Sequence, residues 1–262
     1  ADVFSVPMGD GITDQVLQKW INERTNHLLG DAGKKLQTTK ETAAVLVSAL
    51  YYKDSWHSPF LKQLNTSEVF TAADGRETET EFMHQRTVTD AYCQKDGRYT
   101  VAAIPFESRA SMVFLLPDEG VSLQELLEQG EVTEGLLRWN EKLPADEAEV
   151  QWNIPKFDIQ SELSLTGALN ALGVRQIFDR QAADFSPLTE TGNDLYISQI
   201  MHAGRVKVDE YGCEAAAFTA VSYNGGVWED AKTIHMNLNR PFAFMITGVD
   251  GLPLFIGVVN EV

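Results

Sequence analysis

The stretch at residues 208–227 most constrains how this chain can fold, because it suits both an extended strand and an exposed loop. As a strand, it would place only small or β-branched side chains on one face, namely Cys213, Ala215, Ala217, Thr219 and Val221. No proline occurs between Pro187 and Pro241, so every backbone N–H of the stretch could join a ladder. Residues 222–226 are nevertheless polar and glycine-bearing, which is typical of a turn. The sequence therefore predicts a segment that is a loop in one state and a strand in another.

The composition indicates a globular protein with a substantial core and an acidic surface. Of the 262 residues, 44% are hydrophobic and 23% are charged, and the formal net charge is −17. This charge disfavours nucleic acid as a partner, and no apolar run approaches the roughly 20 residues that span a membrane. Two cysteines, Cys93 and Cys213, are too few for a disulfide framework. The chain starts at Ala1 rather than Met, which is compatible with a removed secretory leader.

The arrangement of reactive residue types does not indicate an enzymatic site. The five histidines form no His-Glu-x-x-His motif, and the chain has neither a Gly-x-Ser-x-Gly motif nor a phosphate-binding glycine loop with lysine. Cys213 is a poor nucleophile candidate, because the adjacent carboxylate of Glu214 disfavours the thiolate. We therefore expect no catalytic residue, no metal and no cofactor, and a plain hydrolase is the least favoured interpretation.

Hydrophobic periodicity and turn residues predict a mixture of helices and antiparallel strands along the chain. Turns are expected at Gly9-Asp10-Gly11, Asp74-Gly75, Asp96-Gly97 and Asp250-Gly251. Helices are expected from about residue 13 to residue 30 and at residues 123–129, 132–143 and 163–172, the last ending at Gly173. Strands are expected at residues 2–6, 42–52, 150–157, 195–202, 240–246 and 253–259, with several short ones between residues 68 and 118.

Several motifs, in a fixed order along the chain, resemble those of one protein family. Residues 210–217, with the sequence Glu-Tyr-Gly-Cys-Glu-Ala-Ala-Ala, resemble the hinge of the serpin reactive-centre loop. Other segments that resemble serpin motifs are Lys53 to Trp56, Pro59-Phe60, Phe82-Met83-His84-Gln85, Pro155-Lys156-Phe157 and the apolar strands within residues 240–259. Because the matches extend from residue 2 to residue 262 in the family's order, the chain is identified as a member of the serpin family.

The resemblance implies an α+β fold, with the several sheets and the mobile reactive-centre loop of a serpin. Residues 1–262 would form a single serpin-type domain that corresponds to the C-terminal two thirds of the family fold. The N-terminal third would be missing, since nothing in the chain resembles the family's N-terminal helices. We favour a fragment or nicked product, with an N-terminal fragment of the same protein as a partner, over a divergent short member. Such a chain alone would leave apolar surface uncovered.

The resemblance also implies a function without catalysis, the suicide inhibition of a serine protease. The protease attacks the loop at about residues 212–230, and the acyl-enzyme is trapped as the loop inserts into the main sheet. The implied hinge residues are Glu210, Gly212, Cys213, Glu214, Ala215, Ala216, Ala217 and Thr219. The implied scissile bond joins Gly226 and Val227, and small residues there favour an elastase-like or subtilisin-like target. The length of the segment before Arg240 also permits cleavage after Trp228 or Glu229.

Four positions depart from the family pattern. His202 matches the histidine of the sheet-opening switch, but Ser48 replaces the asparagine expected as its partner. A partly buried, hydrogen-bonded histidine without a switching role is the simpler interpretation of His202. The other departures are Asp54 in place of glycine, Cys213 in place of Thr or Ser, and Phe218 in place of a small residue. The lost asparagine and the bulk of Phe218 favour one alternative, a non-inhibitory serpin that acts as a carrier, chaperone or storage protein.

The expected location is extracellular, as for a secreted inhibitor, and a cytoplasmic location is compatible with the same sequence. Asn65-Thr66-Ser67 matches a glycosylation sequon. One chance match is expected in a chain of this length, so the motif does not decide the compartment.

Overall fold

The computed structural model describes residues 6–24, 38–39, 42, 52–93, 98–188, 196–197, 200–213 and 233–262. The chain divides into two compact units, one of Ala1–Tyr51 with Gln160–Arg205 and the other of Tyr52–Ile159 with Val206–Val262. The division falls within two strands, β7 (Phe157–Ser164) and β8 (Met201–Asp209). The larger unit positions the candidate site.

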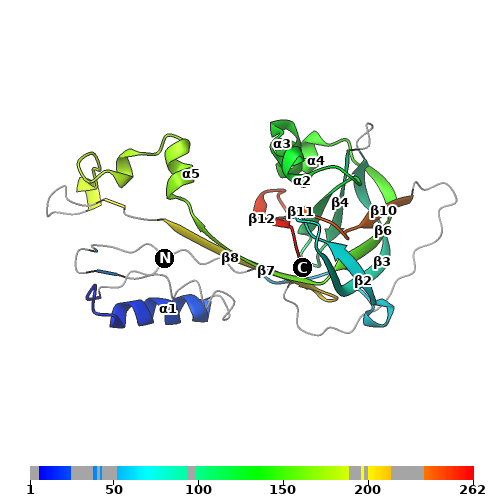
Figure 1. Ribbon diagram of the computed structural model, residues 1–262, viewed down its shortest axis with the longest axis horizontal. Helices are drawn as coiled ribbons and strands as arrows, with labels where there is room; N and C mark the ends of the chain where they lie inside the picture. Colours follow the sequence, from blue (N-terminus) through cyan, green and yellow to red (C-terminus); the bar gives the residue numbers. More distant parts are fainter. Residues whose placement is uncertain are drawn as a thin grey trace. The chain divides into compact units, whose positions relative to one another are not determined.

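An eight-stranded sheet forms the framework of the larger unit (Figure 1). Its strands follow the order β10-β6-β3-β4-β5-β11-β12, and β2 pairs with β3 beside this path. The pairing of β10 with β6 is parallel, and the other described pairs are antiparallel. The strands are β2 (Thr66–Thr71), β3 (Glu77–Cys93), β4 (Tyr99–Pro105), β5 (Ser111–Pro117), β6 (Asp146–Pro155), β10 (Thr233–Asn237), β11 (Phe242–Thr247) and β12 (Pro253–Val259).

Two hairpins of this sheet confirm predicted turns. β2 and β3 pair antiparallel on either side of Asp74-Gly75, and β11 and β12 do so on either side of Asp250-Gly251. Gly75 and Gly251 have φ values of 84° and 78°, a conformation that glycine adopts without steric cost. The third predicted turn, Asp96-Gly97, lies outside the described residues.

The central strands are buried on both faces, which explains why β5 and β11 are continuously apolar. One face carries an aromatic core that includes Trp56, Phe70, Phe114, Trp152 and Phe242. The other face is covered by three short helices, α2 (Leu123–Leu127), α3 (Gly130–Leu137) and α4 (Trp139–Lys142) (Figure 1). The prediction of one helix at residues 132–143 is wrong, because Arg138 leaves the helical conformation with φ −125° and ψ 38°.

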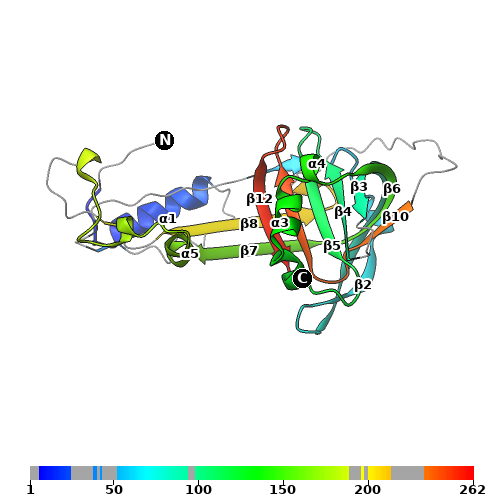
Figure 2. The same cartoon turned by 90° about the horizontal axis from the view of Figure 1, so that it is seen from above.

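Gly212 and Cys213, which belong to the predicted hinge, lie in a second sheet of four strands, in the order β1-β9-β8-β7. β1 (Asp54–Ser55) and β9 (Gly212–Cys213) are two residues long, whereas β7 and β8 are long neighbouring strands (Figure 2). β7 follows Lys156 directly and ends at Ser164, so the predicted helical start at Leu163 is wrong. The apolar residues Phe157, Ile159 and Leu163 are separated by even numbers of positions, which is the period of a strand.

The smaller unit contains helices α1 (Ile12–Arg24) and α5 (Thr166–Ala171). The side chain of Asp10 accepts hydrogen bonds from the backbone N–H groups of Ile12 and Thr13, which caps α1. Gly173, with φ 92°, follows the end of α5 as predicted. The 3₁₀ helices are η2 (Lys62–Leu64) in the larger unit and η3 (Gln176–Phe178) and η4 (Ser186–Leu188) in the smaller. Among the described helices, none has the length and apolar character needed to cross a membrane.

Candidate functional site: the two ends of the 214–232 segment

The candidate site is centred on the β8–β9 hairpin, which immediately precedes residues 214–232. The strands pair antiparallel through Val208 with Cys213 and Asp209 with Gly212. β9 is therefore held against the last two residues of β8. The pairing is only two residues long, so it contributes few backbone hydrogen bonds.

The other edge of β9 lies against β1, where Asp54 faces Cys213 and Ser55 faces Gly212. Gly212 has φ 147°, and a Cβ at this position would meet the carbonyl oxygen of Asp54 and would lie 2.8 Å from the Cα of Ser55. Any other residue would be both strained and obstructed by backbone. The glycine of the hinge motif therefore allows β9 to fit against β1.

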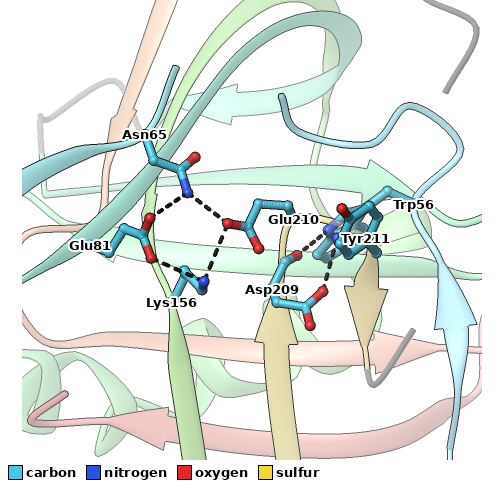
Figure 3. A network of polar contacts seen from close by, with 7 residues as sticks. All are labelled: Trp56, Asn65, Glu81, Lys156, Asp209, Glu210 and Tyr211. Carbon is cyan, nitrogen blue, oxygen red and sulfur yellow. Dashed lines mark hydrogen bonds and ion pairs between the residues drawn. The ribbon is translucent and has the colours of Figure 1, made fainter. Parts of the chain in front are cut away.

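Glu210, in the hairpin turn, is the centre of a polar network (Figure 3). Its carboxylate accepts hydrogen bonds from Asn65 Nδ2 at 2.7 Å and from Lys156 Nζ at 3.2 Å. Asn65 Nδ2 and Lys156 Nζ also donate to the carboxylate of Glu81, at 2.9 Å and 3.0 Å. One cation and one amide are thus shared by two carboxylates, and they join β3 and the residues that directly follow η2 and β6 to the hairpin turn. Glu210 is 3% exposed, so the two bonds to its own carboxylate are partly shielded from solvent, whereas the two bonds to Glu81 are exposed.

The charges of this network reinforce one another. Burial alone would raise the pKa of Glu210, but hydrogen bonds from its own backbone, Asn65 and Lys156 hold the pKa below the ordinary value. Hydrogen bonds from Asn65 and Lys156 also lower the pKa of Glu81. Burial alone would lower the pKa of Lys156, but its bonds to Glu81 and Glu210 raise the pKa overall. All three groups are therefore charged at neutral pH, which suits holding a segment in place rather than transferring a proton.

Backbone hydrogen bonds fix the same turn from a second side. The carbonyl oxygens of Glu210 and Tyr211 accept from the N–H groups of Phe60 and Trp56, each at 2.9 Å. Trp56 Nε1 donates to the carbonyl oxygen of Asp209 at 2.9 Å, and the Asp209 carboxylate accepts from the Tyr211 N–H at 2.9 Å (Figure 3). Trp56 is completely buried, so its indole defines the position of the turn.

The far end of the 214–232 segment is held differently. There β10 pairs with β6 in parallel along Thr233–Asn237, and Ile234 and Met236 are buried. Asn153 Nδ2 donates to Asn237 Oδ1 at 2.7 Å and to Glu68 Oε2 at 2.8 Å. A full strand with an apolar face therefore fixes this end.

The structure brings together only part of the predicted site. Glu210, Gly212 and Cys213 are adjacent and buried, as just described. His202 lies in β8 and is exposed, which differs from the partly buried histidine of the simpler interpretation. The predicted residues that lie outside the described ranges are Ser48, Glu214, Ala215, Ala216, Ala217, Phe218, Thr219, Gly226 and Val227. Within the described ranges, no cluster of three or more His, Cys, Asp or Glu residues could hold a metal ion.

Sequence reasoning did not find the groups that hold Glu210. The sequence places Asn65 only in a sequon, but its amide nitrogen donates to two carboxylates. The Pro-Lys-Phe motif contains Lys156 but indicates no partner for it. Their separations from Glu210 are 145 and 54 residues, so no local pattern links them. The one available signal was the presence of Lys156 and Glu210 in separate motifs of the same family.

Comparison with known proteins identifies the family. The family model for Serpin (serine protease inhibitor) matches residues 1–262. The chain belongs to the serpin family. It is 30% identical to human plasminogen activator inhibitor 2 over 237 residues, which are 88% of this chain and 55% of that protein.

The serpin assignment also agrees with solved structures. Serpin48 of the insect Tenebrio molitor superimposes with a TM-score of 0.78 at 25% identity, covering 96% of this chain and 65% of that one. A thyroxine-binding globulin solved with thyroxine gives a TM-score of 0.72 at 21% identity, covering 96% and 65%. These matches confirm a serpin fold.

The serpin chain is short relative to its relatives. It spans 55%, 63% and 62% of the lengths of three curated proteins that it matches.

Proposed function

We propose that the protein carrying this chain inhibits a serine protease, with about residues 212–230 as the loop that the protease attacks. The observation that carries the proposal is the anchored turn at Glu210, which fixes the start of the loop beside β8. Membership of a family described by serine protease inhibition supports the same function. The chain supplies no catalytic group, because the target protease provides the nucleophile.

The β8–β9 register supports strand insertion after cleavage. Val208 faces Cys213, and the same antiparallel register, continued along β8, would place Ala217 opposite Gly204. Two residues further, Thr219 would face His202, which is exposed and accessible to it. Insertion adds backbone hydrogen bonds and buries small side chains, and several residues at about 1 kcal/mol each can offset distortion of a bound protease. In this proposal His202 and Ser48 belong to the point where the sheet opens.

The proposed scissile bond lies between Gly226 and Val227, and the proposed target is elastase-like or subtilisin-like. Small residues suit the narrow specificity pockets of such enzymes. Cleavage after Trp228 would instead indicate a chymotrypsin-like target, and cleavage after Glu229 a glutamate-specific one.

Incubation with elastase, subtilisin and chymotrypsin tests the proposal. The expected product, seen by denaturing electrophoresis and intact mass, is a boiling-resistant adduct with a released peptide that starts near Val227. Ala217→Arg should abolish the adduct, because a charged side chain on the inner face blocks insertion. Ala216→Arg is the matched control on the outer face and should preserve it. Cleavage without adduct in the unsubstituted protein would exclude inhibition.

A second proposal concerns the partner of this chain within its own protein. Leu252, Leu254, Ile256 and Val258 are exposed on or beside β12, which is an edge strand of the sheet. We infer that further polypeptide of the same protein, such as an N-terminal fragment, covers this surface. Native mass spectrometry of the protein from its source should reveal that polypeptide, and a species of residues 1–262 alone would contradict the proposal.

The alternative function is that of a non-inhibitory serpin, such as a carrier. The same fold occurs in a thyroxine-binding globulin solved with thyroxine, and the bulk of Phe218 within the predicted hinge favours this alternative. Cleavage near Val227 would then leave the melting temperature unchanged, whereas insertion should raise it strongly.

We place the inhibitor in the extracellular space, and its abundance in culture medium relative to cell lysate tests that location.

A further inference from the structure

The carboxylate of Asp54 accepts three hydrogen bonds from groups in and around β1. Oδ2 accepts a hydrogen bond from the Tyr52 hydroxyl at 2.8 Å and another from the Ser108 hydroxyl. Oδ1 accepts from the Ser55 N–H at 2.9 Å. Burial, and then the hydrogen bond to Asp54, raises the pKa of Tyr52, so its phenol remains a donor at neutral pH. The side chain therefore joins β1 to the turn that carries Ser108.

That turn holds β1 on the side away from the hinge. The Glu107 N–H donates to the carbonyl oxygen of Ser55 at 2.9 Å, and the Ala110 N–H donates to the Ser108 hydroxyl at 3.2 Å. The Ser108 hydroxyl, which in turn donates to Asp54, is thus oriented by its own turn. β1 has two residues, and their side chains bury little apolar area, so these polar contacts contribute directly to holding it in place.

β9 packs directly against the backbone of Asp54. Asp54 faces Cys213 in the register of the two strands, and its carbonyl oxygen fills the space where Gly212 has no side chain. A displacement of Asp54 would therefore move the backbone against which Gly212 and Cys213 pack. Hydrogen bonds to a charged carboxylate are stronger than those between neutral groups. The side-chain hydrogen bonds of Asp54 can therefore stabilise this arrangement more than the two-residue ladder between β1 and β9 does.

From this geometry we propose that Asp54, with Tyr52 and Ser108, is a latch that sets how readily Gly212 and Cys213 leave their place beside β1. Asp54 is a positioning residue, since it acts on the hinge through β1. The inference rests on the proposed function, because release of β9 would precede insertion of the loop. The latch itself is a local property, so it can be measured without any protease.

Cys213 provides the measurement, because the residue is 2% exposed and its thiol should react only when β9 opens. Every other cysteine, including the half-buried Cys93, is replaced by serine, and the rate of modification by a thiol reagent is recorded in native buffer. Asp54→Ala should accelerate labelling about tenfold, since three hydrogen bonds are lost. Tyr52→Phe and Ser108→Ala, which each remove one bond, should accelerate it about threefold. Asp54→Asn should fall between the unsubstituted protein and Asp54→Ala, because its amide oxygen still accepts.

The exposed Asp90 of β3 supplies the matched control, and Asp90→Ala should leave the labelling rate unchanged. Urea unfolding of each variant separates a latch from a general loss of stability. A latch predicts faster labelling at an almost unchanged unfolding midpoint. The proposal is overturned if labelling is unchanged in all the variants, or if it rises only in proportion to lost global stability.

The outcome is independent of the inhibition assay. Labelling that follows the expected order without any protease adduct would keep the latch and reject the inhibitor. Adduct formation with unchanged labelling in Asp54→Ala would reject the latch alone.

Discussion

The two ends of the 214–232 segment are held by different kinds of interaction. At the far end, β10 pairs with β6 along five residues and buries Ile234 and Met236. At the near end, β9 is two residues long, and hydrogen bonds to Glu210 hold the adjoining turn. Apolar burial is non-directional and is lost only when a whole strand separates. Polar contacts depend on geometry and can be lost one at a time.

This difference supports our proposal of which end moves. In that proposal, a ladder with an apolar face keeps the far end in place, whereas the near end leaves after a few directional bonds break. The proposed insertion requires this asymmetry, since the hinge must enter the sheet while β10 stays in position. Each of the following predictions concerns a change that weakens the interactions at one end of the 214–232 segment.

The largest effect is expected at the apolar end. Met236→Ala should lower the free energy of unfolding by about 2–5 kcal/mol, because the side chain is fully buried and its loss leaves a cavity. The exposed His235 on the same strand is the control, and His235→Ala should change it by less than about 0.5 kcal/mol. Urea unfolding measures both. Equal effects would contradict the claim that apolar burial fixes this end.

At the polar end, Glu210→Ala should cost about 2–3 kcal/mol, because it leaves Asn65 and Lys156 without their buried acceptor. Lys156 keeps its bond to Glu81, which limits the loss. The exposed Glu77 of β3 is the control for a lost surface carboxylate. Labelling of Cys213 should accelerate in Glu210→Ala and not in Glu77→Ala. An unaltered labelling rate would show that the network does not secure the hinge.

Gly212→Ala should cost about 2 kcal/mol, because it combines a strained φ with an obstructed Cβ. Gly75→Ala is the matched control, since Gly75 also has positive φ but has open space around its Cα. That control should cost about 1 kcal/mol, the backbone strain alone. Chemical denaturation of both variants gives the difference, and a Gly212 effect no greater than that of Gly75 would mean that β1 yields to the new methyl group.

The smallest effect is a dependence on pH. The pKa values of Glu210 and Glu81 are lowered in the folded protein, so their stabilisation is complete above the ordinary value of 4.5 and is lost as pH falls below it. The pKa of Lys156 is raised, so its contribution is complete below 10.5 and is lost at higher pH. The stability difference between the unsubstituted protein and Glu210→Gln should therefore be constant from about pH 5 to pH 10 and shrink in acid. A difference that grows in acid would reverse this assignment.

Local sequence patterns predicted many elements of the fold. The β11–β12 hairpin follows from two apolar runs around Asp250-Gly251, and the end of α5 follows from Gly173. Local patterns failed where two periodicities overlap. Leu163 continues the alternation of β7, yet its leucine neighbours at Leu165 and Leu169 also suggested a helix.

The sequence by itself determined the family and predicted the position of the hinge, because Glu210, Gly212 and the small residues that follow form a contiguous motif. That Gly212 is required was decided by the tertiary structure, because a Cβ there would meet the backbone of Asp54 and Ser55, which are distant along the chain. Only the tertiary structure decided that Asn65 and Lys156 hold Glu210, and that Asp54 supports Cys213. These partners are distant along the chain, and hydrogen bonds form only where folding brings a donor and an acceptor within about 3 Å.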